Sequence, residues 1–210
     1  MQSFSALLDT LNQASPERQP AIEQLILDTF QRRKAVLALD MSGFTLTVRR
    51  DGILAYLRQI RRMQQITTPL VLAYQGAVVK NEADNLLAVF DDAQQAVRAA
   101  LAMLASAAMT ATATAVAAGS VSGAPAIAFS IGIDYGDVLL IDHVDCFGDA
   151  VNLAYKLGED IARPGELLVT QAIRDQLGAG AGMAGLQLQD MTVSVSGLAV
   201  VAYAVTPTPQ

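Results

Sequence analysis

The chain has 210 residues, of which 52% are hydrophobic and only 16% are charged, so it can bury the core of one compact domain with a small appendage. The 20 acidic and 14 basic residues give a net charge of −6, which argues against a general nucleic-acid-binding protein. The single cysteine, Cys146, excludes an internal disulfide, and the N-terminus lacks the basic start and apolar run of a signal peptide. We therefore expect a soluble cytoplasmic protein that binds no nucleic acid.

The chain begins with two predicted helices. Residues 1–14 have a short helical pattern, and Ser15-Pro16-Glu17 is typical of a helix start, which predicts a second helix over about 16–32. Residues 1–32 are therefore interpreted as an N-terminal helical segment. The apolar run 35–40 that follows suits a buried central strand.

The middle of the chain combines helical and strand patterns. Residues 52–74 have helical periodicity, and the sequence NEADN (81–85) separates two strand-like runs as a hairpin. A further helix begins near residue 91, and the Ala/Thr/Gly/Ser stretch 107–124 is predicted to be a loop. Residues 99–118 carry no charge, but Ala and Thr are only weakly apolar, so we predict no membrane span.

The last third of the chain is predicted to continue this mixture. Tyr135-Gly136 is interpreted as a hairpin turn between two strands, and residues 145–160 as one helix with an apolar face. A strand, a short helix and two strands around Ser196-Gly197 complete the chain. Strands mixed with helices and several hairpins predict an α+β fold, a mixed α/β sandwich.

Two acidic residues could lie together. Asp40 ends the predicted central strand, and Asp84 lies in the turn of the neighbouring hairpin. Two carboxylates together with phosphate oxygens suit Mg²⁺, which prefers hard oxygen ligands. From spacing alone, a helix-capping acid at Asp40 and a solvated turn acid at Asp84 are the more common explanation, because acids are frequent at such positions.

The sequence DCFGDAVNLAYKLGED (145–160) carries a second polar set. Asn152 and Lys156 are four residues apart and share one face of the predicted helix, and Asp145 lies at its start. The three side chains could face a common space, although a capping acid with two solvated neighbours would give the same pattern. Lys80, alone, is typical of a surface lysine at a strand end. His143 and Cys146 are interpreted as packing residues, because a four-ligand metal spacing is absent.

Taken in order, these segments resemble the class III adenylate/guanylate cyclase catalytic domain family. The resemblance runs from about residue 33 to 206, and we assign 33–207 to a cyclase homology domain. Its motifs are LALDMSGFT, VVKNEADNLLAVF, FSIGIDYGDVLL, DCFGDAVNLAYKL, RPGELLVTQ and SGLAVVAYAV. It implies a ferredoxin-like βαββαβ core sheet flanked by helices.

The resemblance also implies a role for each polar residue. Two divalent ions per site, Mg²⁺ or Mn²⁺, would be held by Asp40 and Asp84. The purine would be read by Lys80 and Asp145, and the triphosphate would meet the backbone of Met41, Ser42, Gly43 and Phe44. The ribose or attacking oxygen would be positioned by Asn152, and Lys156 would stabilise transition-state charge. The family's sites form at a head-to-tail dimer interface, which implies a homodimer with shared active sites.

Three positions depart from the family pattern. Lys156 replaces the usual arginine, so it keeps the charge but loses the two-pronged geometry, which implies reduced activity. Ala83 replaces the glycine before the metal acid, and Ser196 stands where a lysine is common. Because the family pairs a lysine with an aspartate to read adenine, the resemblance implies an adenylate cyclase that converts ATP to 3′,5′-cyclic AMP and pyrophosphate. The alternatives are an impaired, nucleotide-binding regulatory module and a guanylate cyclase.

Overall fold

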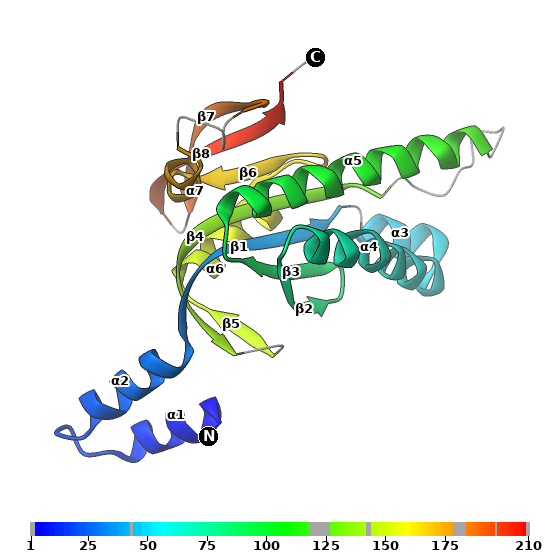
Figure 1. The fold of residues 1–210 in the computed structure, drawn as a ribbon. Coiled ribbons are helices and arrows are strands. Elements are labelled where there is room, and N and C mark those ends of the chain that lie inside the picture. The colour runs from blue at the N-terminus through cyan, green and yellow to red at the C-terminus, as the bar shows by residue number, and fades with distance from the viewer. Residues whose placement is uncertain are drawn as a thin grey trace.

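The structure, a computed structural model, describes residues 3–42, 44–117, 127–141, 144–178, 184–195 and 197–208. Within these ranges, helices cover both faces of an open sheet, and two further helices precede it (Figure 1). The predicted mixed α+β class is therefore confirmed.

The two N-terminal helices, α1 (Phe4–Gln13) and α2 (Gln19–Phe30), pack against each other through Leu7, Ile22 and Ile26. The ring of Phe4 stacks on Phe147 of β5, with 6.1 Å between the centroids. The second helix begins later and ends earlier than the predicted range of about 16–32. The basic run 32–34, expected at its end, belongs to the first strand instead.

One sheet organises the rest of the chain. Its strand order is β2-β3-β1-β4-β6-β8-β7, with β5 paired to the end of β4; the β4–β6 pair is parallel and the other pairs are antiparallel. The strands are β1 (Gln31–Met41), β2 (Ala77–Glu82), β3 (Asn85–Phe90), β4 (Phe129–Ile141), β5 (Asp145–Phe147), β6 (Leu167–Thr170), β7 (Leu186–Val195) and β8 (Leu198–Pro207).

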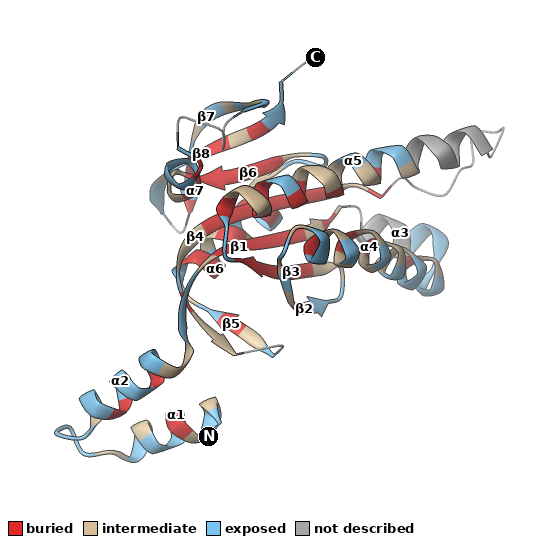
Figure 2. Cartoon of the chain, in the orientation of Figure 1, coloured by how far each residue is buried: buried red, intermediate tan, exposed pale blue. Residues whose placement is uncertain are grey.

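Helices lie on both faces of this sheet (Figure 1). They are α3 (Phe44–Asp51), α4 (Ile53–Ala73), α5 (Ala93–Ala117), α6 (Asp149–Tyr155), the π-helix η1 (Lys156–Ile161) and α7 (Gln171–Leu177). Alternate residues of β1 face opposite ways: Leu37 and Leu39 pack with α4, α5 and α7, whereas Val36 and Ala38 pack with α6. A central strand covered on both faces is a continuous apolar run, and Figure 2 shows β1 and its neighbours buried.

The structure corrects three of the sequence predictions. Tyr135 and Gly136 lie inside the continuous strand β4, because the long ladder with β1 overrides a local turn signal. The predicted loop at 107–124 is helical through residue 117, since α5 runs further than its last large apolar residues suggest, and residues 118–126 lie outside the description. Residues 145–147 form a strand, so Phe147 does not share a helix face with Val151.

The sequence predicts no membrane span. Among the residues that the structure describes, no helix is both long and apolar enough to cross a membrane.

Candidate active site

The two predicted metal acids lie at one end of the central strands. Asp40 is near the end of β1, and Asp84 lies in the tight turn between β2 and β3. The backbone carbonyl of Asp84 accepts a hydrogen bond from the amide of Met41 (3.2 Å), which joins the turn to the end of β1. Burial and, next, the charge of Asp84 together raise the pKa of Asp40 to about 6, against the opposing effect of the Met41 amide. The two carboxylates therefore share a partly desolvated space.

The turn that presents Asp84 uses an unusual backbone conformation. Ala83 has φ of 51°, in the left-handed region that favours glycine. The sequence raised the possibility that this turn needs a positive φ, and the structure places Ala83 in that conformation. Asp84, the candidate metal ligand, is therefore presented by a turn in which the side chain of Ala83 makes the backbone conformation strained.

Two polar residues flank Asp40 across the sheet. In the strand register, Asn85 of β3 and Ser130 of β4 stand directly opposite it, so all three side chains lie on the face covered by α6. The Oδ1 atom of Asn85 is buried and has no hydrogen-bond partner among the described residues. This end of the sheet thus combines two carboxylates with a buried amide oxygen that has no hydrogen-bond partner among the described residues.

These groups fit a hard divalent cation. The desolvated like charges of Asp40 and Asp84 favour a bound positive charge, and carboxylate and amide oxygens are the donors that Mg²⁺ accepts. Within the described part of the chain, no group of three or more His, Cys, Asp or Glu side chains is placed to hold a metal. Mg²⁺ sites commonly use one or two protein carboxylates and complete their shell with water and substrate phosphate.

Two further side chains face the acids from opposite sides. Tyr56 of α4 is buried, and its pKa is raised by burial, by the charge of Asp84, by a hydrogen bond to Asp84 and by the charge of Asp40. Glu159 of η1 has its pKa raised first by burial and then by the charge of Asp40. The tyrosine therefore offers Asp84 a hydrogen bond, and the glutamate adds negative potential.

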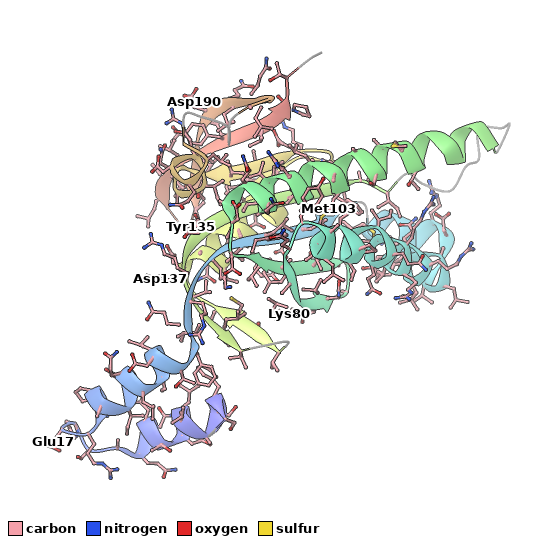
Figure 3. The ribbon with its side chains drawn as sticks, in the orientation of Figure 1. Glu17, Lys80, Met103, Tyr135, Asp137 and Asp190 are labelled. Atoms are coloured by element: carbon pink, nitrogen blue, oxygen red, sulfur yellow. The ribbon has the colours of Figure 1, made fainter. Side chains whose placement is uncertain are left out.

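The predicted base-reading pair is also assembled within one chain. Lys80 lies on β2 on the side of the sheet where β5 projects (Figure 3), and its Nζ is 3.0 Å from Oδ1 of Asp145 on β5. The hydrogen bond to Asp145 is the largest cause of the raised pKa of Lys80. The same Oδ1 accepts the amide of Cys146 at 2.8 Å. A cation and an acceptor therefore stand side by side at the edge of the sheet.

The surroundings of this pair are apolar. The ring of Tyr155 packs against the cluster that contains Val79 and Cys146, which adjoin the two base readers in sequence. Burial raises the pKa of the Cys146 thiol to about 11, so it stays protonated at neutral pH. This agrees with the interpretation of Cys146 as a packing residue.

Asn152 and Lys156 lie on the exposed side of α6 and at its junction with η1, while Val151 and Ala154 are buried beneath them. The Nζ of Lys156 is 2.6 Å from Oδ2 of Asp160, and both side chains are about half exposed, at 49% and 55%. Such a solvent-exposed pair is weak, so Lys156 can exchange it for a stronger anionic partner.

The junction is held against the sheet by glycines. A Cβ added at Gly158 would lie 2.8 Å from the carbonyl oxygen of Ala38 and 2.9 Å from the amide of Gly132. Only glycine permits this approach of backbone to backbone. The π-helix that begins at Lys156 therefore rests directly on β1 and β4, and its register sets the position of the lysine.

The predicted triphosphate turn is only partly described. The amide of Met41 donates to Asp84 and that of Ser42 donates to the carbonyl of Ala128 (3.0 Å), so neither amide is free for phosphate. Gly43 lies outside the described residues, and Phe44 begins α3. His143 and Ser196 also lie outside them.

Sequence reasoning did not single out Tyr56, Asn85, Tyr155 or Glu159. Asn85 carried a usable signal, because a polar residue at the start of an otherwise apolar strand and next to a candidate metal acid is worth inspection. Tyr56 and Tyr155 gave no such signal, since a tyrosine within a helical pattern is ordinarily a core residue. Glu159 gave none either.

No family model matches the chain. A curated protein from Rhizobium meliloti (strain 1021), named "Putative adenylate cyclase 3", is 31% identical over 145 residues, which make up 69% of this chain and 23% of that protein. The chain thus spans only a small part of the length of that relative.

Solved structures match over nearly their whole length. An adenylate/guanylate cyclase/hydrolase from Silicibacter pomeroyi has 29% identity and a TM-score of 0.66, covering 85% of this chain and 99% of that one. The guanylyl cyclase Cya2 has 19% identity and a TM-score of 0.70, covering 86% and 94%. The fold is therefore that of nucleotide cyclase catalytic domains.

The sequence likeness and the fold agree with the motifs. The chain belongs to the class III adenylate/guanylate cyclase catalytic domain family, as the sequence predicted.

Proposed function

We propose that this chain is an adenylate cyclase, which converts ATP to 3′,5′-cyclic AMP and pyrophosphate. One observation carries the proposal: two pairs that the family pattern assigns to metal binding and base reading are each brought together by the fold. They are Asp40 with Asp84, and Lys80 with Asp145. Each pair joins residues that are far apart in the sequence, β1 with the β2–β3 turn and β2 with β5, so neither is a product of sequence proximity.

The proposed reaction is attack of the ribose 3′-hydroxyl on the α-phosphorus, with pyrophosphate leaving. Bound Mg²⁺ or Mn²⁺, two per site, would lower the pKa of that hydroxyl and neutralise the developing charge. Asp40 and Asp84 would hold the ions, and burial of Asp40 strengthens each electrostatic interaction there. Asn152 would orient the ribose, and Lys156 would place its ammonium against the phosphate charge. Since little covalent work falls to the protein, positioning dominates.

Base recognition favours adenine. Adenine offers an N6 amino donor and an N1 acceptor; Asp145 would accept from the first and Lys80 would donate to the second. Asp145 has one oxygen already engaged by Lys80 and by the amide of Cys146, and its second oxygen is the one proposed for the amino group. Guanylyl cyclases are among the structural neighbours, so a guanylate cyclase is the second candidate.

We further propose a head-to-tail homodimer with shared sites. Within one chain, burial and the charge of Asp84 raise the pKa of Asp40 and the Met41 amide lowers it, while Lys156 is paired with Asp160. A catalytic cation that does not act on its own chain's metal acids agrees with a site completed by a second copy. Lys80 and Asp84, four residues apart, would then serve two different sites.

Lys156 is the reason to expect slow turnover. An ammonium is a point charge and cannot form the two parallel hydrogen bonds of a guanidinium. This substitution is also the observation that favours a third candidate, a cyclase-like module that binds nucleotide and regulates a partner without turnover.

The test is a cyclic nucleotide assay on purified protein with Mn²⁺ and either ATP or GTP. We expect cyclic AMP from wild type, none from Asp40→Ala, and unchanged turnover in Asp137→Ala, which removes an exposed carboxylate of β4. Binding of ATP without turnover, in wild type and in Lys156→Arg, would favour the regulatory module. Full activity in Asp40→Ala, or in a strictly monomeric protein, would refute the metal assignment or the shared site respectively.

A further inference from the structure

The side-chain oxygen of Asn85 has no hydrogen-bond partner among the described residues, although buried polar atoms ordinarily have one. Its Oδ1 atom is buried, and the structure gives it no hydrogen bond within the described residues. A buried amide oxygen without a partner is strongly unfavourable, and native proteins retain few of them. An atom of this kind at an active site indicates a ligand that is absent from the protein alone.

The register defines what this oxygen faces. Asn85 stands directly opposite Asp40 in the β1–β3 ladder, and it follows Asp84 in the chain. Directly opposed residues of an antiparallel pair have Cβ atoms about 5 Å apart on the same face. The Asn85 oxygen is therefore a close neighbour of the Asp40 carboxylate, on the face covered by α6 and η1.

The neighbours on this face make a cation the best-matched occupant. Asp40, Asp84 and Glu159 all add negative charge there, since the three carboxylates lie close enough for their charges to interact. An amide oxygen accepts but does not donate, so it cannot pair with those carboxylates. It can share a hard divalent cation with them, because such ions take amide carbonyl oxygens together with carboxylates.

We infer that Asn85 contributes its amide oxygen to the divalent metal site, as a neutral third ligand beside Asp40 and Asp84. This inference rests on the proposed metal site and adds a residue to it. It explains why a polar side chain begins the face of β3 on which the apolar residues Leu87 and Val89 follow at alternate positions.

The inference predicts opposite effects with and without metal. Asn85→Ala removes an uncompensated oxygen, so the metal-free protein should unfold at the same or a higher temperature than wild type. The same change should weaken Mn²⁺ binding by about 10-fold or more, the lower end of the effects seen for supporting groups at metal sites. Asn85→Asp should do the reverse, tightening Mn²⁺ binding and lowering the unfolding temperature of the metal-free protein, because it adds a third carboxylate.

The experiment measures free Mn²⁺ by electron paramagnetic resonance during titration of the protein alone, together with thermal unfolding with and without Mn²⁺. Asn81→Ala is the matched control, since it removes an exposed asparagine from the same hairpin. Asp40→Ala reports on the metal site itself.

The outcomes separate the two proposals. Weaker binding in Asn85→Ala, tighter binding in Asn85→Asp and wild-type binding in Asn81→Ala support the inference. Wild-type binding in Asn85→Ala, when Asp40→Ala has lost binding, overturns the role of Asn85 and leaves the metal site standing. Wild-type binding in Asp40→Ala overturns both. If Asn85→Ala does not fold, failure of Asn85→Asp to tighten Mn²⁺ binding overturns the inference.

Discussion

Replacing Ala83 by glycine should stabilise the protein and improve the presentation of Asp84. Ala83 has φ of 51°, and a left-handed conformation costs a residue with a Cβ roughly 1–2 kcal/mol. Glycine removes this strain but gains freedom in the unfolded chain, which offsets about 0.5–1 kcal/mol. The expected net gain in free energy of unfolding is therefore about 0.5–1 kcal/mol.

Thermal and urea unfolding of the metal-free protein measure this gain. For a domain of this size, 1 kcal/mol corresponds to about 2–4 °C in Tm, so Ala83→Gly should raise Tm by about 1–4 °C. Turnover or Mn²⁺ affinity should rise as well, because relaxing the turn frees Asp84 to adopt the geometry that the ion requires.

Gln75 provides a matched control, since it also has a positive φ, of 60°, but lies at the end of α4 outside the proposed site. Gln75→Gly should give a similar rise in Tm without a change in Mn²⁺ affinity. A fall in Tm in Ala83→Gly would show that the alanine does not occupy the left-handed conformation. A rise in Tm with unchanged metal affinity and turnover would show that the strain does not reach Asp84.

Three further predictions concern the same end of the sheet. Lys156→Arg should raise turnover by roughly 10- to 1000-fold, the range for one hydrogen-bond donor to the transition state. The weak ion pair with Asp160 should not prevent this rise, and a slower enzyme would contradict the role of residue 156. Gly158→Ala should lower the free energy of unfolding by about 1–3 kcal/mol and reduce turnover, because its Cβ would lie 2.8 Å from a backbone oxygen of β1; wild-type stability in urea would be the contrary result. The folded-state pKa of Asp40 is raised from 3.8 to about 6, so its proton stabilises the metal-free fold fully below about pH 4, and this contribution disappears as the pH rises through 6. Asp40→Asn, which stays neutral, should therefore gain stability relative to wild type between pH 4 and 6, and parallel pH profiles for the two proteins would refute the assignment.

The sequence by itself was sufficient for the fold class, the family and the principal polar residues. The apolar run ending in Asp40 predicted a buried strand, because only a strand covered on both faces is apolar at every position. The ordered motifs predicted the pairing of Lys80 with Asp145 and of Asp40 with Asp84. The roles of these residues in binding and catalysis stay predictions.

Local signals failed where long-range pairing decided the outcome. Tyr135-Gly136 has the composition of a turn, yet it lies within β4, because its pairing with Ala35 and Lys34 continues a ladder along β1. Residues 145–147 looked like the start of a helix, and they became a strand because β4 extends far enough to pair with them.

Only the tertiary structure decided how the site is supported. The strain at Ala83, the close approach of Gly158 to β1 and the uncompensated oxygen of Asn85 depend on atoms brought together from different elements. A sequence pattern records which residue types alternate along one element, whereas strain, contact distance and an unmet hydrogen bond arise between elements. For this protein, the sequence therefore determined which residues form the candidate site, and the packing of β1, β3 and η1 determined how they are held.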